Sequence, residues 1–202
     1  MDVFVTAIGT DSGKTLVSAI LVEALNADYW KPIQAGLPRD TDTVQQLVGN
    51  SQRTFWSETY LLNTPASPHA SAKIDQVEID LMQINKPRTP NNLVIEGAGG
   101  LLVPINDNHY VIDIARKLQT PILLVCNLYL GSINHSLLSI EYLKQHKLEV
   151  AGIIFNGLSN PESEKIIASK SPWPVLLHVQ QETIITKEKI LKYASRLKGV
   201  LK

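Results

Sequence analysis

The chain has 202 residues, of which 44% are hydrophobic and 19% are charged, and its formal net charge is zero. This length fits one domain with a substantial core, and the balanced charge argues against nucleic acid as a partner. One cysteine, Cys126, excludes an internal disulfide and a cysteine-based metal cluster. The apolar stretches are too short to span a membrane and the N-terminus does not resemble a signal peptide, so we expect a cytoplasmic protein.

Short β-rich runs alternate along the chain with longer helical patterns. Strands are expected at 3–6, 29–33, 93–96, 122–126, 150–155 and 175–177, and helices at 15–25, 111–118, 133–145 and 187–197. Several strand runs are continuously apolar, which is typical of strands buried on both faces of a parallel sheet. The polar stretch 49–65 is expected to be irregular and to lie near one end of the sheet. The alternation predicts one α/β domain over residues 1–202 with right-handed crossovers.

The first predicted strand runs into TAIGTDSGKT at residues 6–15, which ends like a phosphate-binding loop. The usual pattern, G-x-x-x-x-G-K-[ST], would place a glycine at Ile8, but the glycine present is Gly9, one residue later. A G-K-[ST] triplet arises by chance in roughly one chain of this length in ten. The position of the triplet, after the first predicted strand and at the start of the first predicted helix, is better support for a phosphate site. The N–H groups and dipole at the start of a helix attract phosphate.

Two side chains of this loop are expected to act on a nucleotide. Lys14 is placed to reach the β- and γ-phosphates, and the Thr15 hydroxyl is placed to ligate Mg²⁺. The alternative is a glycine turn before a helix with a solvated lysine. The strand–loop–helix context favours the nucleotide site.

Charged residues of the next segment suggest a second part of the site. Lys31 lies in the apolar run WKPI, where an unpaired lysine is costly, so we expect it to face an anionic ligand. A lysine extending to solvent from an edge strand is the alternative. Asp40 and Asp42 precede a helical pattern; we expect Asp40 to be its N-cap and Asp42 to be a carboxylate ligand of Mg²⁺.

The strand expected at 93–96 ends in an acidic residue, Glu96, which is followed by the glycine-rich run 97–100. Nucleotide sites need a carboxylate at the end of a buried strand to hold the metal ion. Glycines there let the backbone approach a ligand closely and turn N–H groups toward phosphate. A tight turn after an edge strand is the alternative interpretation.

Seven segments, in this order, resemble the dethiobiotin synthetase family. They are TAIGTDSGKT, WKPIQAG, TD at 41–42, ASPHASA at 66–72, VIEGAGGLLVPI at 94–105, YLGSINHSLL at 129–138 and AGIIFNG at 151–157. The resemblance runs through residues 3–157, about three-quarters of the chain. It implies a P-loop NTPase-like three-layer fold with a mostly parallel central sheet.

The resemblance also implies a reaction. Enzymes of this family use ATP, Mg²⁺ and CO₂ to close a ureido ring on 7,8-diaminopelargonate, through a carbamate and a carbamic-phosphoric anhydride. By resemblance, Mg²⁺ would be gathered by Thr15, Asp42 and Glu96. The nucleotide would be bound by Asp11, Ser12, Gly13, Lys14, Thr15, Leu16, Asp42, Glu96, Gly97, Ala98, Gly99, Asn156 and Gly157, of which Asn156 contacts the adenine.

Catalytic and substrate contacts follow from the same resemblance. Lys14 would stabilise the transferring phosphoryl group, and Lys31 would face the carbamate. In the family, the loop at 131–134 reaches the active site of the other subunit, which implies a homodimer with composite sites. The substrate would therefore be contacted by Lys31, Ala35, Gly131, Ser132, Ile133 and Asn134. Ser132 is expected to be the N-cap of the following helix, leaving the N–H groups of 132–134 free for a carboxylate.

Three positions depart from the family pattern. Ala7 stands where the family's longer loop has its first glycine, and Gly9 is expected to supply the flexibility instead. Ala35 stands where the family has a hydroxyl residue that contacts the substrate. The run LHVQQE at 177–182 replaces a GEIP-like segment that surrounds the adenine, so selectivity for ATP is expected to be relaxed.

Other enzymes of the same fold are the main alternatives. A partitioning-type ATPase would carry a second lysine early in the loop, where this chain has Ala7 and Ile8. A cobyrinate-type amidation enzyme would need a glutaminase module, for which this chain has no room. A GTPase switch would need Asn-Lys-x-Asp, but Asn127 is followed by Leu128-Tyr129.

Overall fold

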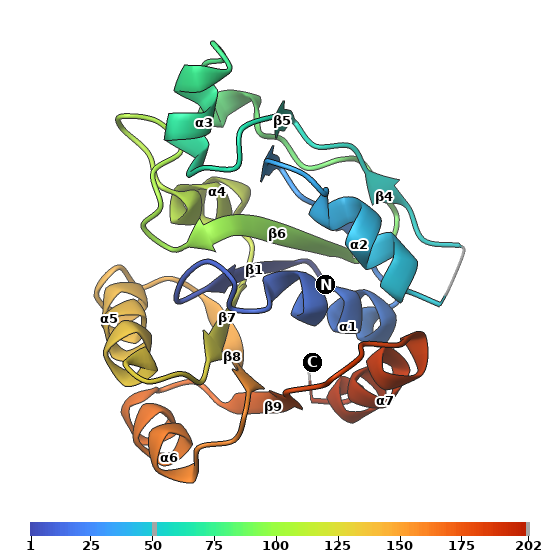
Figure 1. The fold of residues 1–202 in the computed structure, drawn as a ribbon, viewed down its shortest axis with the longest axis vertical. Coiled ribbons are helices and arrows are strands. Elements are labelled where there is room, and N and C mark those ends of the chain that lie inside the picture. Colours follow the sequence, from blue (N-terminus) through green and yellow to red (C-terminus); the bar gives the residue numbers. More distant parts are fainter. Residues whose placement is uncertain (50–51, 201–202) are drawn as a thin grey trace.

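The computed structural model describes residues 1–49 and 52–200, which fold around a seven-stranded sheet (Figure 1). The strand order is β4-β2-β6-β1-β7-β8-β9, and each neighbouring pair is parallel. The strands are β1 (Val3–Ala7), β2 (Asp28–Trp30), β4 (Phe55–Trp56), β6 (Leu93–Gly100), β7 (Ile122–Asn127), β8 (Val150–Gly157) and β9 (Val175–Gln180). A second, parallel pair of strands consists of β3 (Ile33–Ala35) and β5 (Tyr60–Leu62).

Helices cover both faces of the sheet, so the predicted three-layer α/β fold is confirmed (Figure 1). One face carries α1 (Lys14–Leu25), α2 (Asp40–Leu47) and α7 (Lys187–Leu197). The other carries α4 (Val111–Leu118), α5 (Ser132–Gln145) and α6 (Pro161–Lys170). The short helix α3 (Pro68–Ile74) lies beside the small sheet, and a single 3₁₀ turn spans Leu81–Gln83. In the described part of the chain, no helix has the length and apolar character needed to cross a membrane.

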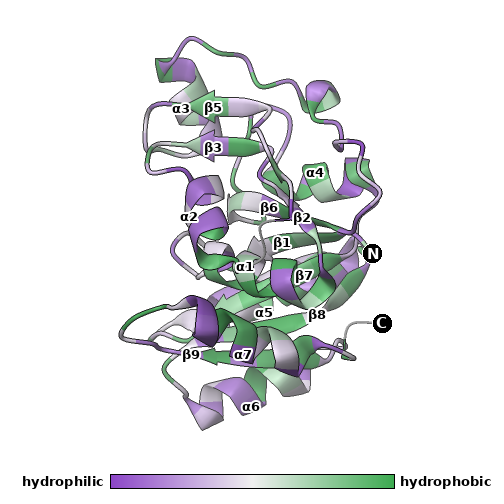
Figure 2. Ribbon diagram, turned by 90° about the vertical axis from the view of Figure 1, so that its right-hand side faces the viewer, coloured by the Kyte–Doolittle hydropathy of each residue, from purple (hydrophilic) through white to green (hydrophobic). Residues whose placement is uncertain are grey.

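Successive residues of the central strands enter two different cores. Val3 and Val5 pack with α1 and α7, whereas Phe4, between them, packs with the side chains of α4 and α5. In Figure 2 the central strands are coloured predominantly as hydrophobic. Both faces of β1 are therefore buried, which explains why its sequence is continuously apolar instead of alternating.

The structure corrects one predicted strand. The run 29–33 is divided: β2 ends at Trp30, and β3 starts at Ile33 in the second sheet. Pro32 has no N–H to donate to a sheet ladder, so the strand cannot continue through it. Lys31 therefore lies just beyond the end of a strand of the central sheet, not within that strand.

The stretch 49–65 is less irregular than predicted. Residues 50–51 lie outside the described residues, but 55–56 form the edge strand β4 and 60–62 form β5. Helices α3 and α6 were also not expected from the sequence. The strands β4 and β5 have only two and three residues, too few to show a periodic pattern, which is why the sequence did not predict these two strands.

Because the strands are parallel, their carboxyl ends lie along one edge of the sheet. The segments that follow β1, β2, β6 and β8 therefore come together there, although they are far apart in sequence. This edge is where ligands bind in open α/β sheets.

Candidate nucleotide and substrate site

A pocket of about 890 Å³ opens at the carboxyl edge of the sheet. Most of the expected nucleotide-loop residues line it, together with Lys31, Ala35 and Glu96. Its remaining walls come from the start of α2, the segment 65–68 and Val103. The full lining is Thr10, Asp11, Ser12, Gly13, Lys14, Thr15, Leu16, Lys31, Gln34, Ala35, Asp40, Thr43, Leu47, Pro65, Ala66, Ser67, Pro68, Glu96, Ala98, Gly99, Val103 and Ile185.

The phosphate-binding loop turns at Asp11 and Gly13. These residues have φ of 54° and 90°, in the left-handed region, whereas Gly9 is not among the residues with positive φ. The expectation that Gly9 supplies the flexibility is therefore wrong: an aspartate, which tolerates this conformation better than most residues, takes one turn instead. Ser12 Oγ donates to the carbonyl of Gly9 at 3.0 Å and closes the loop.

Ala7 fits its position without strain. It is the last residue of β1, is fully buried, and pairs with Gly100 and Val125 in extended conformation. The loop begins after this residue, so the missing first glycine changes only the strand end. A Cβ on Gly100 would lie 3.3 Å from Gly9 Cα, which shows how closely β6 approaches the loop.

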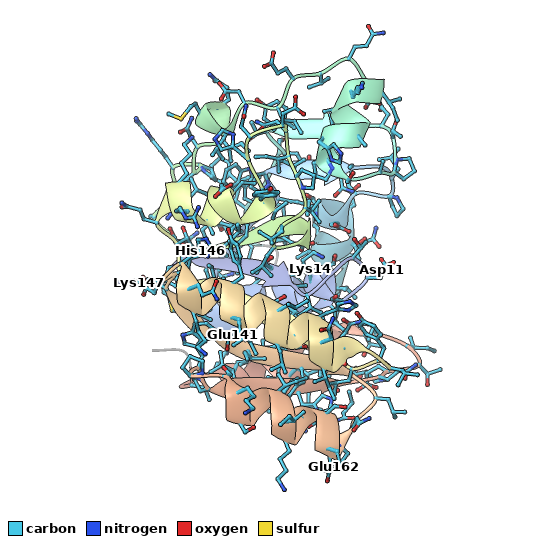
Figure 3. All side chains as sticks on the ribbon, turned by 90° about the vertical axis from the view of Figure 1, so that its left-hand side faces the viewer. Asp11, Lys14, Glu141, His146, Lys147 and Glu162 are labelled. Carbon is cyan, nitrogen blue, oxygen red and sulfur yellow. The ribbon has the colours of Figure 1, made fainter. Side chains whose placement is uncertain are left out.

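Helix α1 begins at Lys14 with Gly13 as its N-cap, and no side chain caps it. The first N–H groups of a helix lack intrahelical partners and favour an anion. Lys14 and Asp11 mark this end of the loop in Figure 3. Lys14 Nζ donates to the carbonyl of Gly9 at 3.2 Å. Burial, and then the charge of Lys31, lowers the pKa of Lys14 to about 8.

Asn156 lies directly against the phosphate-binding loop. Its Nδ2 donates to the carbonyl of Ser12 at 3.0 Å. A Cβ built on Gly13 would lie only 2.2 Å from that same nitrogen, so glycine is required there for space as well as for its φ. Neither Asn156 nor Gly157 lines the pocket itself, and of the two it is Asn156 that contacts the loop.

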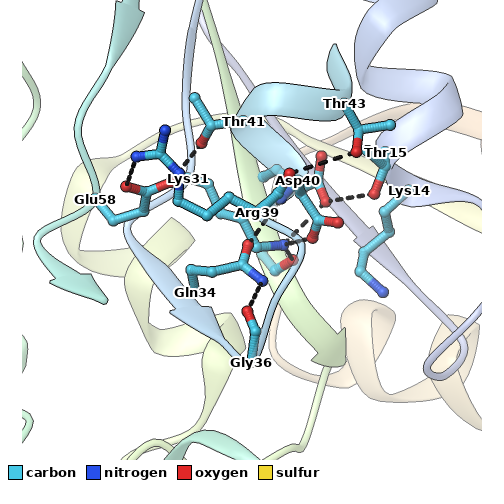
Figure 4. Close-up of polar contacts among 12 residues, drawn as sticks. Lys14, Thr15, Lys31, Gln34, Gly36, Arg39, Asp40, Thr41, Thr43 and Glu58 are labelled. Atoms are coloured by element: carbon cyan, nitrogen blue, oxygen red, sulfur yellow. Dashed lines mark hydrogen bonds and ion pairs between the residues drawn. The ribbon is translucent and has the colours of Figure 1, made fainter. Parts of the chain in front are cut away.

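Lys31 forms the centre of a buried charge cluster (Figure 4). Its Nζ lies 2.5 Å from Asp40 Oδ2 and 3.0 Å from Glu96 Oε1, and its side chain is 4% exposed. Burial alone would lower the pKa of Lys31, but the two carboxylates outweigh it and raise the pKa. For Asp40, burial alone would raise the pKa, but the charge of Lys31 outweighs burial and holds the pKa of Asp40 below its ordinary value.

Glu96 accepts three hydrogen bonds within this cluster. Oε1 accepts from Lys31 and, at 3.1 Å, from Thr15 Oγ1, while Oε2 accepts from Tyr29 at 2.9 Å. Glu96 itself is fully buried. Burial, and then the charge of Glu96, raises the pKa of the Tyr29 hydroxyl well above its ordinary value, so this group remains a donor.

The two aspartates of α2 do not lie where the sequence analysis expected them. Arg39 is the N-cap of the helix, and Asp40 is its first residue, with its carboxylate in the Lys31 cluster. Asp42 instead accepts from Arg39 Nε at 3.0 Å, is 43% exposed and does not line the pocket. The N-cap assignment of Asp40 is wrong because its side chain is drawn to a buried lysine.

The glycine-rich residues of β6 have two roles: one allows close packing against the core, and others line the pocket. The strand continues to Gly100, so these residues are not a loop after the strand. A Cβ on Gly97 would lie 3.0 Å from both Phe4 and Val111, and Gly97 is not part of the pocket lining. Ala98 and Gly99 do line it, and Gly99 has a φ of 70°.

Residues 131–134 lie outside the pocket. Gly131, not Ser132, is the N-cap of α5. The Ser132 side chain is buried without a hydrogen-bond partner, and its N–H already donates to the carbonyl of Tyr129 at 2.9 Å, so that N–H is not free as expected. Beside this turn, Leu130 is fully exposed.

Two residues of the cluster were missed by the sequence analysis. Tyr29 donates to Glu96, and Gln34 Oε1 accepts from the backbone N–H of Asp40 at 3.1 Å, which fixes the start of α2. Gln34 is buried, and its Nε2 donates to the carbonyl of Gly36 at 2.9 Å. A glutamine inside an apolar run was the available signal, because a buried amide needs partners.

The oxygen ligands available in the pocket are suited to Mg²⁺ bound together with a nucleotide. Thr15, Asp40 and Glu96 place a hydroxyl and two carboxylates at one side of the pocket, next to Lys14. No cluster of three or more acidic, histidine or cysteine side chains suited to a metal occurs among residues 1–49 and 52–200. Mg²⁺ usually takes one or two carboxylates and completes its shell with water and phosphate oxygens, so this incomplete set is the expected one.

Comparisons with known proteins relate the whole chain to one family. A sequence model of the family described as an AAA domain matches residues 1–189. The ATP-dependent dethiobiotin synthetase BioD of Cytophaga hutchinsonii is 52% identical over 196 residues, 96% of this chain and 95% of that protein. The BioD proteins of Christiangramia forsetii and Brucella anthropi are 44% and 48% identical, covering 96% and 83% of this chain and 95% and 80% of their own.

Solved structures show the same fold at low identity. The septum site-determining protein MinD of Pyrococcus horikoshii, a complex with Mg-ADP, matches with a TM-score of 0.59 and 15% identity over 98% of this chain and 89% of that one. A ParA family ATPase from Chlorobium tepidum matches with a TM-score of 0.54 and 13% identity over 98% and 92%. These likenesses show a P-loop NTPase-like fold. With 52% identity to a named relative over 96% of its length, the chain belongs to the ATP-dependent dethiobiotin synthetase family.

Proposed function

We propose that this chain is an ATP-dependent cyclo-ligase that forms dethiobiotin from 7,8-diaminopelargonate and CO₂ in biotin biosynthesis, with residues 1–202 acting as one domain. One observation carries the proposal: Lys31, paired with two carboxylates, shares a pocket with Lys14 of the phosphate-binding loop. The names of three relatives support the same activity. A partitioning-type ATPase is less well supported, because the ParA likeness is at 13% identity and concerns the fold alone.

The reaction would run in three steps. One amine of the substrate attacks CO₂ and, on losing a proton, becomes a carbamate. A carbamate oxygen attacks the γ-phosphorus of ATP, and ADP leaves with the electron pair of the broken P–O bond. The second amine attacks the carbamate carbon, phosphate leaves, and loss of the amine proton completes the ring.

The pocket is suited to these steps because they gather negative charge. Lys14, which now donates to the Gly9 carbonyl, would turn to the phosphoryl oxygens and stabilise their charge in the transition state. Lys31 would exchange part of its contact with Asp40 for the carbamate. When bound, Mg²⁺ would supply positive charge at the phosphates, held by Thr15, Glu96 and a carboxylate of α2.

We propose that the carboxylate of α2 is Asp40, with Asp42 as the competing candidate. Asp40 lines the pocket and lies in the Lys31 cluster, whereas Asp42 pairs with Arg39. Asn156, which touches Ser12 of the loop, would contact the base. An amide can both donate to and accept from adenine.

We further propose a homodimer in which residues 131–134 complete the site of the other subunit. In one chain these residues do not line the pocket, although the family resemblance assigns them to the substrate. The fully exposed Leu130 and the partly exposed Ile133 beside this turn are the apolar surface that such a contact would cover.

A cytoplasmic location is also part of the proposal. The single cysteine, Cys126, is buried and unpaired, so the fold needs no oxidising compartment to form a disulfide. Fractionation of cells that express the chain from its own promoter is expected to place it with cytoplasmic markers. Recovery with membranes or secreted proteins would contradict this.

The activity is tested by incubating the purified chain with 7,8-diaminopelargonate, bicarbonate, ATP and MgCl₂. We expect dethiobiotin, ADP and phosphate in equal amounts, and no ATP consumption when the diamine is omitted. ATP hydrolysis that does not depend on the diamine would instead support the partitioning-type alternative.

Complementation tests the shared site. Lys31→Ala is mixed with a variant disrupted at 131–134, under conditions of subunit exchange. In a mixed dimer one site collects both defects and the other is intact, so with random pairing about a quarter of full activity is expected to return. No recovery despite proven exchange would show that each chain completes its own site.

A further inference from the structure

Tyr29 is a buried titratable side chain that the proposed steps do not use. It lies in the middle of β2, is fully buried, and does not line the pocket. Its ring packs on Phe55 with centroids 6.2 Å apart. Its hydroxyl nevertheless points to Glu96 and donates to Oε2 at 2.9 Å.

The hydrogen bond from Tyr29 decides which way the Glu96 carboxylate faces. Oε2 accepts from Tyr29 on the buried side, while Oε1 faces Thr15 and Lys31 at 3.1 and 3.0 Å. A carboxylate rotated about its last bond would lose the tyrosine donor or the two pocket donors. Because Glu96 is fully buried, water cannot replace a lost donor at low cost.

We propose that Tyr29 is a positioning residue: its hydroxyl fixes the Glu96 carboxylate so that one oxygen stays directed at the metal–nucleotide side of the pocket. This inference rests on the proposed function, in which Glu96 helps to hold Mg²⁺. Partners that orient metal-binding carboxylates in this way typically change metal affinity or activity by 10–100-fold when removed.

Tyr29→Phe tests the proposal by removing one oxygen while keeping the ring. Mn²⁺ binding in the presence of ADP is measured by electron paramagnetic resonance, and the Mg²⁺ requirement of dethiobiotin formation is measured separately. We expect Mn²⁺ affinity to fall and the Mg²⁺ requirement to rise by about tenfold or more, with a smaller loss of kcat at saturating Mg²⁺. Unchanged Mn²⁺ affinity, or a loss of kcat alone, would overturn the proposal.

A matched control separates positioning from general stability. Tyr60→Phe removes a hydroxyl that exchanges hydrogen bonds with the Asp80 backbone, at 3.0 and 3.3 Å, outside the pocket. We expect this variant to lower the unfolding midpoint slightly and to leave Mn²⁺ affinity unchanged. Equal loss of Mn²⁺ affinity in both variants would show that the effect of Tyr29 is structural only.

A double-mutant cycle shows whether Tyr29 acts through Glu96. In the Glu96→Gln background, Tyr29→Phe is expected to cause no further loss of Mn²⁺ affinity, and an additive loss would reject the mechanism. If Tyr29→Phe unfolds at the assay temperature, the titration is repeated in the cold with a stabilising osmolyte. Mn²⁺–ADP binding does not require ring closure. The effect of Tyr29→Phe on Mn²⁺ affinity can therefore be measured even if the wild-type chain does not form dethiobiotin, and the two failures are distinguishable.

Discussion

Lys31 Nζ lies 3.0 Å from Glu96 Oε1, and their side chains are only 4% and 0% exposed. The residue proposed to face the carbamate and the residue proposed to hold the metal ion are thus each other's partners. Removing one partner of a buried pair of this kind is costly, because the remaining charge stays in a low-dielectric site.

Lys31→Met is expected to abolish ring closure while ADP affinity stays within several-fold of wild type. Unfolding should become easier by roughly 3 kcal/mol, at the low end for a broken buried pair, because Glu96 keeps Thr15 and Tyr29 as donors. Calorimetry and product assays measure both effects. Lys189→Met, which breaks a partly exposed pair with Glu182 (35% and 22% exposed), is the stability control and should cost less than about 1 kcal/mol. Retained ring closure in Lys31→Met would remove Lys31 from the reaction.

Nucleotide affinity is expected to fall as pH rises above about 8. The pKa of Lys14 is lowered to about 8 in the free protein, so its charge is present below that pH and is lost above it. Binding phosphate then requires proton uptake, which costs up to about tenfold in affinity per pH unit. Titration calorimetry with ADP from pH 7 to 9.5 measures this effect. Lys14→Arg stays charged, so its affinity should vary little over this range. A flat wild-type profile would contradict the role of Lys14.

Asp40→Asn is expected to raise the Mg²⁺ requirement by tenfold or more, and Asp42→Asn to change it far less. The reason is that Asp40 lines the pocket, while Asp42 is 43% exposed and paired with Arg39. Mg²⁺ titrations of activity and Mn²⁺ binding with ADP compare the two variants directly. The reverse order would show that ligand binding frees Asp42 from Arg39 and that the prediction from sequence was right.

Gly13→Ala should weaken ADP binding by more than tenfold and lower the unfolding midpoint. Its φ of 90° disfavours a side chain, and the new Cβ would overlap Asn156 Nδ2. Gly199→Ala is the control for backbone strain, because φ there is 93° but nothing lies within 4 Å. Adding Asn156→Ala to Gly13→Ala should restore part of the stability by removing the overlap. Normal ADP binding by Gly13→Ala would show that the loop can move away from Asn156 freely.

Selectivity among nucleotides is expected to be relaxed. The run 177–182 departs from the family, and in the structure His178 Nε2 contacts the Gly157 carbonyl at 3.0 Å while Nδ1 lies 3.3 Å from Glu164 Oε2. This segment therefore makes contacts within the protein beside the proposed base site. Turnover with ATP, CTP and GTP at subsaturating concentrations measures the preference. A preference for ATP above roughly a hundredfold, about 2.7 kcal/mol, would show that another segment reads the base.

Several features were available from the sequence because they depend on local physics. The helices at 111–118 and 187–197 have the predicted bounds, since their apolar spacing is clear over two or more turns. Lys14 at a helix start was also correctly located, and Glu96 lies on the predicted buried strand, although that strand continues past it to Gly100. The resemblance in motif order predicted the family that the comparisons then showed.

The tertiary structure decided what the local patterns could not. Which aspartate enters the cluster depends on how α2 starts relative to Lys31, and Arg39 and Gln34 fix that start. The contact of Tyr29 with Glu96 requires β2 and β6 to be neighbours, although 67 residues separate the two side chains in the chain. Hydropathy and turn residues specify each element, but strand order and register determine which distant side chains meet, and those meetings set the charge and geometry of the site.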